Sequence, residues 1–227
     1  MGRRLAALLA GFTLSVLALV AIPTPAFAST DTYDAFTAEY TVTPEGVLRV
    51  RETWVLRFGS GSGRHGFDRY LVTREPFGSS GQDQIYRIDD IAVSSPDPIS
   101  TDFNVSTNTG GSSREESIRI RIGDANTTIK ADRATFVIAY TVEGALRMGP
   151  GDHPELYWDA TGSDMGTIFD ATVRTTVPGG VVATQCFSGP PTTSNPCTSQ
   201  TFSGNTATFK VDQISHGSLL TVATQMN

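Results

Sequence analysis

Apolar and polar residues alternate along several stretches of this chain, and one long stretch runs from Val47 to Phe58. The apolar residues that share one face of this stretch are Leu48, Val50, Trp54, Leu56 and Phe58. The other face carries Arg49, Arg51, Thr53 and Arg57. A period of two over this length predicts a strand with one buried and one solvent-exposed face.

Glu52 interrupts the apolar row in the middle of that strand. A buried, ionised carboxylate is costly unless it gains a cation and hydrogen bonds. Arg69 and His65 both lie in the segment after the strand, and Arg69 suits a two-pronged hydrogen bond. The sequence therefore predicts a structural ion pair between Glu52 and Arg69. The alternatives are a bulge that turns Glu52 outward and a catalytic acid.

Further alternating segments are separated by turns rich in Gly and Pro, notably 118–122 and 134–142. The polar, Gly-rich segment 75–84 is expected to be a loop, and 94–111 to hold only a weak strand near Phe103. Residues 127–130 are expected to return beside 118–122. About ten strands and no amphipathic helix predict an all-β fold, an antiparallel, immunoglobulin-like β-sandwich formed by residues 29–227 as one domain.

The first 28 residues have the pattern of a secretory signal peptide. Arg3 and Arg4 precede an uncharged apolar run from Leu5 to Ile22, and Ala26-Phe27-Ala28 offers a cleavage site after Ala28. An uncleaved anchor helix is the alternative. No second apolar run of spanning length follows, so the mature chain is predicted to be exported without a membrane span, either secreted or at the outer face of the cytoplasmic membrane.

The chain is acidic. Its 17 Lys and Arg residues face 23 Asp and Glu residues, and loss of Arg3 and Arg4 leaves 15 against 23, a net charge of −8. Such a surface argues against nucleic acid or an anionic membrane as the partner.

Both cysteines, Cys186 and Cys197, lie in the segment that would be exported. An oxidising compartment makes a disulfide the expected state of a lone pair this close in sequence. A metal site would need further soft ligands, and none lies nearby. We therefore predict a disulfide and expect neither a metal nor a cofactor.

The stretch from Ala139 to Ser163 holds an unusual set of polar and aromatic residues. The weak site candidates here are Asp152, His153, Glu155 and Asp159. They could ligate a metal or pair an acid with a base, but the Gly and Pro residues around them favour an exposed turn. Asp159 follows Trp158 on an expected strand and could be a partly buried structural carboxylate. Tyr140, Tyr157 and Trp158 could line a sugar-binding face, although aromatic residues at strand spacing more often belong to a core.

Common catalytic motifs are absent from the sequence. It contains no G-x-S-x-G, phosphate-binding loop or dinucleotide fingerprint. Its three histidines, His65, His153 and His216, have no identifiable serine or cysteine partner.

The order and spacing of several segments nevertheless match a known pattern. These segments are EGVLRVRETWVLRF, GRHGFDRYL, IRIGD, FVIAYTVEGAL, ELYWDATG and CFSGP followed by PC. Over about Tyr33 to Thr224 the chain resembles the exported N-terminal domain of the YciQ-like predicted bacterial membrane proteins, a domain family of unknown function (DUF 2207). The resemblance implies a β-sandwich outside the membrane and no established chemistry.

The sequence departs from the family pattern at two places. Family members usually continue into membrane helices, whereas this sequence stops where those would begin, so it is expected to be either a secreted stand-alone copy or a fragment of a longer protein. The family often has Ile or Val at the position of Phe67 and an acidic residue at the position of Tyr70, so a role for that loop does not carry over.

These observations favour a binding or interaction module of the cell envelope, with an envelope protein or glycan as partner. The rival hypothesis is a hydrolase of envelope polysaccharide that uses a carboxylate pair such as Glu52 and Asp159. An enzyme requires two carboxylates that converge in a pocket, whereas a binding module should present a flat surface or a strand edge.

Overall fold

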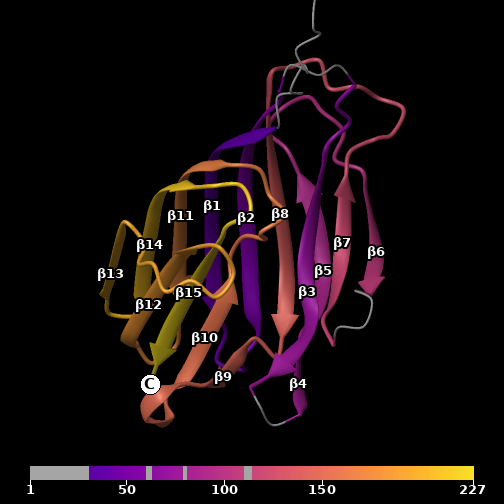
Figure 1. Cartoon of the computed structure of the whole chain (residues 1–227). Coiled ribbons are helices and arrows are strands. Elements are labelled where there is room, and N and C mark those ends of the chain that lie inside the picture. Colours follow the sequence, from indigo (N-terminus) through magenta and orange to yellow (C-terminus); the bar gives the residue numbers. More distant parts are fainter. Residues whose placement is uncertain (1–30, 60–62, 79–80, 110–113) are drawn as a thin grey trace, which may run out of the picture.

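The computed structural model describes residues 31–59, 63–78, 81–109 and 114–227 (Figure 1). The predicted signal peptide and its cleavage site lie outside these residues. Within them the chain forms fifteen strands and a single turn of 3-10 helix, η1 (Pro150–Asp152), with no α-helix. No helix in this part of the chain is long and apolar enough to cross a membrane.

The strands form three sheets. Sheet A contains, in spatial order, β13 (Ser199–Ser203), β14 (Thr206–Ile214), β11 (Ile168–Thr176), β1 (Thr32–Val42), β2 (Leu48–Arg57), β8 (Arg133–Glu143) and β5 (Arg87–Ser94). Sheet B contains β4 (Gln82–Ile85), β3 (Phe67–Phe77), β7 (Glu116–Ile122) and β6 (Phe103–Thr109). Sheet C contains β12 (Val181–Gly189), β15 (Leu219–Met226), β10 (Pro154–Asp159) and β9 (Leu146–Met148).

Sheets B and C both pack against one face of sheet A (Figure 1). On the side of sheet B, the ring of Phe67 lies 5.3 Å from that of Phe136 in β8. On the side of sheet C, the hydroxyls of Thr175 and Thr224 share a hydrogen bond of 2.8 Å between the layers. One hydrophobic cluster therefore draws on all three sheets.

The alternation predicted for Val47 to Phe58 is confirmed in β2, whose residues are alternately buried and at least partly exposed. β2 pairs with β1 on one side and with β8 on the other, and both neighbours bury the same face. The turn between β1 and β2 needs a positive φ at Gly46, which is +83°, a conformation that glycine adopts without strain.

The prediction of a wholly antiparallel fold is wrong at one pair. β1 and β11 are parallel, with Tyr33 opposite Ile168 and Thr41 opposite Thr176. Parallel neighbours need a long crossover connection. Here the chain passes through β2, β5 and β8 of sheet A and through strands of sheets B and C before it returns as β11 in the direction of β1.

The number of strands was underestimated, and the expected loop at 75–84 is wrong. β3 continues to Phe77, and β4 begins at Gln82. Arg74 holds this hairpin through Asp83, its Nε donating to Oδ2 over 2.7 Å. β9 and β13 were not predicted, and residues 127–130 form no strand, because the Ile129 amide donates to the Arg64 carbonyl instead.

Candidate functional site

Glu52 points into the core of sheet A. It lies opposite Ala38 of β1 and Ile138 of β8 with no register shift at that point, and it is fully buried. The alternative of a bulge that turns Glu52 outward is therefore wrong.

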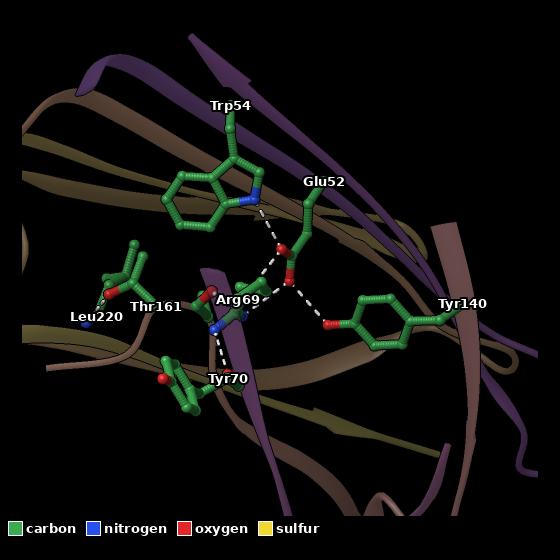
Figure 2. Close-up of polar contacts among 8 residues, drawn as sticks. Glu52, Trp54, Arg69, Tyr70, Tyr140, Thr161 and Leu220 are labelled. Carbon is green, nitrogen blue, oxygen red and sulfur yellow. Dashed lines mark hydrogen bonds and ion pairs between the residues drawn. The ribbon is translucent and has the colours of Figure 1, made fainter. Parts of the chain in front are cut away.

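The carboxylate of Glu52 accepts four hydrogen bonds (Figure 2). Arg69 of β3 supplies two of them, from Nε to Oε2 and from Nη2 to Oε1, each over 2.9 Å. Trp54 Nε1 donates to Oε2 over 2.8 Å, and the Tyr140 hydroxyl donates to Oε1 over 2.7 Å. Each oxygen has two donors, which compensates for the loss of water.

Arg69 also connects the three sheets. Its Nη1 donates to the Tyr70 carbonyl over 2.8 Å, and its Nη2 donates to the Ala160 carbonyl over 3.0 Å. Ala160 directly follows β10, and Thr161 beside it accepts a hydrogen bond from the Leu220 amide over 3.0 Å (Figure 2). One side chain of sheet B thus contacts Glu52 in sheet A and the end of β10 in sheet C.

The network keeps Arg69 charged and Tyr140 neutral. Burial by itself lowers the pKa of Arg69, but the charge and hydrogen bonds of Glu52 outweigh it and hold that pKa above its ordinary value. Burial and the charge of Glu52 raise the pKa of Tyr140 well above the usual range. Arg69 is only 2% exposed, so this charge is screened very little by water.

A groove of about 360 Å³ runs along the seam between sheets B and C, with Arg69 at its floor. Its aromatic walls are Tyr70, Tyr86, Tyr157 and Trp158. The rings of Tyr86 and Trp158 meet edge to face, with centroids 5.4 Å apart. This contact places the segment after β4 against β10 and closes one side of the groove.

The carboxylates along the groove are Glu75, Glu115, Asp159 and Asp164. Asp159 accepts a hydrogen bond from the Thr221 hydroxyl over 2.6 Å, and Glu75 accepts one from the Tyr86 hydroxyl. Protein atoms surround Asp159 on most sides although its surface opens to the groove. This partial desolvation raises the pKa of Asp159, and the hydrogen bond from Thr221 opposes the rise. The charges of Glu75 and Glu115 add to the rise, and the charge of Arg69 opposes it.

The four weak site candidates do not gather into one site. Asp152 and His153 lie at the turn between β9 and β10, and Asp152 is exposed. Glu155 is buried and paired with Arg147, whose Nε donates to Oε2 over 2.8 Å. Asp159 lies four residues further along the strand, about 13 Å away. Within the described residues, no three His, Cys, Asp or Glu side chains could hold a metal ion together.

Glu52 and Asp159 do not face a common space. Asp159 lines the groove, whereas Glu52 is fully buried behind Arg69 and does not line it. Both oxygens of Glu52 are occupied by donors, so this pair lacks the convergence that glycoside hydrolysis requires.

The structure joins Cys186 and Cys197 in a disulfide, with their Cα atoms 5.5 Å apart. The enclosed loop brings Pro191 to the rim of the groove. The predicted disulfide is therefore confirmed, and its loop adds to the wall of the groove.

The sequence does not predict several residues of the ion-pair network and the groove. Tyr140 was assigned to the core face of its strand, and its hydroxyl gave no signal that it would reach Glu52. The sequence predicts a loop at 75–84, which contains Glu75 and precedes Tyr86. It therefore does not indicate that these two residues come together at the groove. Glu115 and Asp164 stand in polar stretches where nothing distinguishes a groove residue from an ordinary surface residue.

These features define an all-β protein in which two smaller sheets cover a larger one around a buried ion pair. The chain belongs to the family described as the N-terminal domain of a predicted membrane protein (DUF2207), which it matches over residues 32–226. The family resemblance inferred from the sequence is thereby confirmed. No curated protein matches the chain.

The solved structures to which the chain is similar include peptidases and a hydrolase. Yeast LTA4 hydrolase is 11% identical, with a TM-score of 0.47 over 86% of this chain and 29% of its own. A putative protease from Parabacteroides distasonis is 12% identical, with a TM-score of 0.41 over 86% of this chain and 40% of its own. An M1 zinc metallopeptidase from Deinococcus radiodurans is 10% identical, with a TM-score of 0.37 over 86% and 42%. The chain thus spans less than half the length of each.

Proposed function

We propose that this protein is an exported binding module of the bacterial cell envelope and that the groove between sheets B and C is its ligand site. In this proposal a signal peptide is removed after Ala28, and residues 29–227 form a single immunoglobulin-like β-sandwich. The mature domain works as a secreted protein or at the outer face of the cytoplasmic membrane, and its partner is an envelope protein or glycan.

The groove is the observation that carries this proposal. Its volume of about 360 Å³ is at the lower end of the range for ligand pockets, and such pockets combine aromatic walls with a few polar groups. The pair of Glu52 and Arg69 has a structural role in this proposal. It holds the edges of sheets B and C at a fixed spacing below the groove.

Hydrolysis of a polysaccharide is the weaker hypothesis. It was based on Glu52 and Asp159 acting together, and Glu52 has no access to a substrate in the groove. Binding needs only the exposed groups of the walls, and these are present.

Site-specific photo-crosslinking in the producing bacterium tests the proposal. A photoreactive benzoylphenylalanine replaces Ser163, an exposed residue at the groove. The matched control carries it at Thr201 on β13, which is exposed and does not line the groove. We expect a discrete adduct from Ser163 and none from Thr201. Equal labelling at the two positions, or none at either, would overturn the proposal.

A further inference from the structure

Two strand edges border the groove, and each is only partly covered by another strand. β3 pairs with β7 from Phe67 to Arg74, but its other edge pairs with β4 only from Arg74 to Phe77. That other edge faces sheet C, because Tyr86, which follows β4 and donates to the Thr73 carbonyl, packs on Trp158. Among the described strands, none covers this edge from Phe67 to Val72.

The edge of β10 is open in the same way. β10 pairs with β15 along Glu155 to Asp159, but with β9 only along Pro154 to Leu156. Within the described residues, its edge from Tyr157 to Asp159 therefore has no strand beside it, and these residues line the groove. Open edges present backbone N–H and C=O groups to which an extended peptide can add as a further strand.

Trp158 lines the groove but is only 6% exposed, and its indole N–H is buried without an acceptor among the described protein atoms. Because this N–H is closed off from solvent, it offers no contact to a ligand in the groove. Trp158 contributes to the groove as an aromatic wall, and the backbone groups of the open edges are what a peptide can reach.

The charge of the groove selects the side chains of such a peptide. None of Glu75, Glu115, Asp159 and Asp164 forms an ion pair within the described residues.

The arginines near the groove are paired with other carboxylates. Arg69 is paired with Glu52, and Arg147, stacked 3.6 Å from the centre of the Tyr157 ring, is paired with Glu155. Arg119, near the Tyr70 ring, is paired with Asp68. Negative charge beside aromatic rings favours an ammonium or guanidinium group.

We propose that the groove binds an extended, basic segment of a partner protein, which adds as a strand to the open edge of β3 while its Lys or Arg side chains meet the groove carboxylates. This inference rests on the proposed function and specifies its ligand. Because side chains alternate along a strand, a segment with basic residues at every second position fits it best.

Fluorescence anisotropy with a labelled heptapeptide, TKVKVRT, tests this inference on the exported protein. One control peptide reverses the charges (TEVEVDT), and a second keeps the charges but is N-methylated at four consecutive central residues, so that neither of its edges can pair with a strand. The protein variants are D159N with E115Q, and the matched control is D212N, an exposed aspartate on β14 that does not line the groove.

We expect the basic peptide to bind and the other two peptides to bind at least about tenfold more weakly. The groove variant should lose about fivefold in affinity, the size of effect expected for exposed charges, and D212N should lose none. Hydrogen exchange of the amides in 70–72 should slow when the peptide is present.

Equal binding of the N-methylated peptide would overturn strand addition and point to an amine-bearing ligand without a peptide backbone. Absence of binding by the basic peptide would overturn the inference as a whole. In that case a crosslink from Ser163 would still support the groove as a ligand site, so failure of this inference is distinguishable from failure of the proposed function.

Discussion

Arg69 and Glu52 face each other in the core as a two-pronged ion pair, with Nε and Nη2 of the arginine each 2.9 Å from a separate carboxylate oxygen. The side chains are 2% and 0% exposed, so neither charge can turn to water if its partner is lost. Stability should therefore depend on the pair as a unit more than on either residue.

Replacing one partner of this pair should destabilise the protein strongly. We expect E52L or R69L alone to lower the free energy of unfolding by roughly 3 kcal/mol, because each strands a buried charge. The double variant should lose much less free energy of unfolding than the sum of the losses in the two single variants. Urea unfolding of the four proteins measures this coupling.

An exposed pair supplies the control for that cycle. Arg87 and Glu143 lie 3.4 Å apart, and their side chains are 75% and 59% exposed. Removing either should shift the unfolding midpoint little. An unchanged midpoint for E52L would contradict the structural role of the buried pair.

Tyr140 and Tyr40 form a matched pair for testing the hydrogen bond to Glu52. Both are at least 98% buried, but the Tyr140 hydroxyl donates to Glu52 whereas the Tyr40 hydroxyl has no partner in the described protein. We expect Y140F to cost roughly 1.5–3 kcal/mol, as for a hydrogen bond to a charged group. Y40F should be neutral or stabilising. Equal losses in urea unfolding would contradict this assignment.

The disulfide should contribute substantially to stability. Closing the loop between Cys186 and Cys197, which are 11 residues apart, should stabilise the protein by roughly 3 kcal/mol in the chain-entropy model. Dithiothreitol should therefore lower the urea midpoint of the natural protein. The double variant C186A with C197A should begin at that lower midpoint and not respond to dithiothreitol. A natural protein that reacts with thiol reagents after unfolding without reductant would contradict the disulfide.

Export should remove the first 28 residues. The charged start, apolar run and Ala-Phe-Ala site of the sequence predict that mature protein begins at Ser29. Intact-mass analysis of material recovered outside the cytoplasm measures this directly. Changing Ala28 to a large residue such as Trp should block processing, and a recovered mass that still includes Met1 would refute cleavage.

Binding of the basic peptide should strengthen as the pH rises. The pKa of Asp159 lies above the ordinary value of an aspartate, because partial desolvation and the charges of Glu75 and Glu115 disfavour its ionised form. Below that pKa the side chain is neutral and attracts no cation, and above it the full charge is present. Affinity should therefore increase as the pH rises through the pKa of Asp159, which lies above the ordinary aspartate value of about 3.9.

The variant D159N isolates this contribution. The variant removes one of the carboxylates of the groove, so its binding should depend less on pH than that of the natural protein. The difference between the natural protein and the variant should have its midpoint above pH ~4. Identical pH profiles would show that Asp159 does not contact the bound cation.

The sequence by itself determined the local pattern of this protein. The period of two in β2 and β8 is enough to place Trp54 and Phe136 inward, because slipping a strand by one residue would expose its whole apolar face. The same pattern marks Glu52 as an inward carboxylate that needs a cation. Two cysteines close in sequence, in a chain whose start predicts export, are enough to predict their bond.

Only the tertiary structure decided how distant segments meet. The parallel pairing of β1 with β11 depends on where the chain returns after sheets B and C, which periodicity does not encode. β4 and β9 are only four and three residues long, and they form because neighbouring strands offer backbone partners. The groove brings Glu75, Asp159 and Asp164 together from separate segments, and an exposed carboxylate has the same local sequence pattern whether or not it has neighbours across a seam.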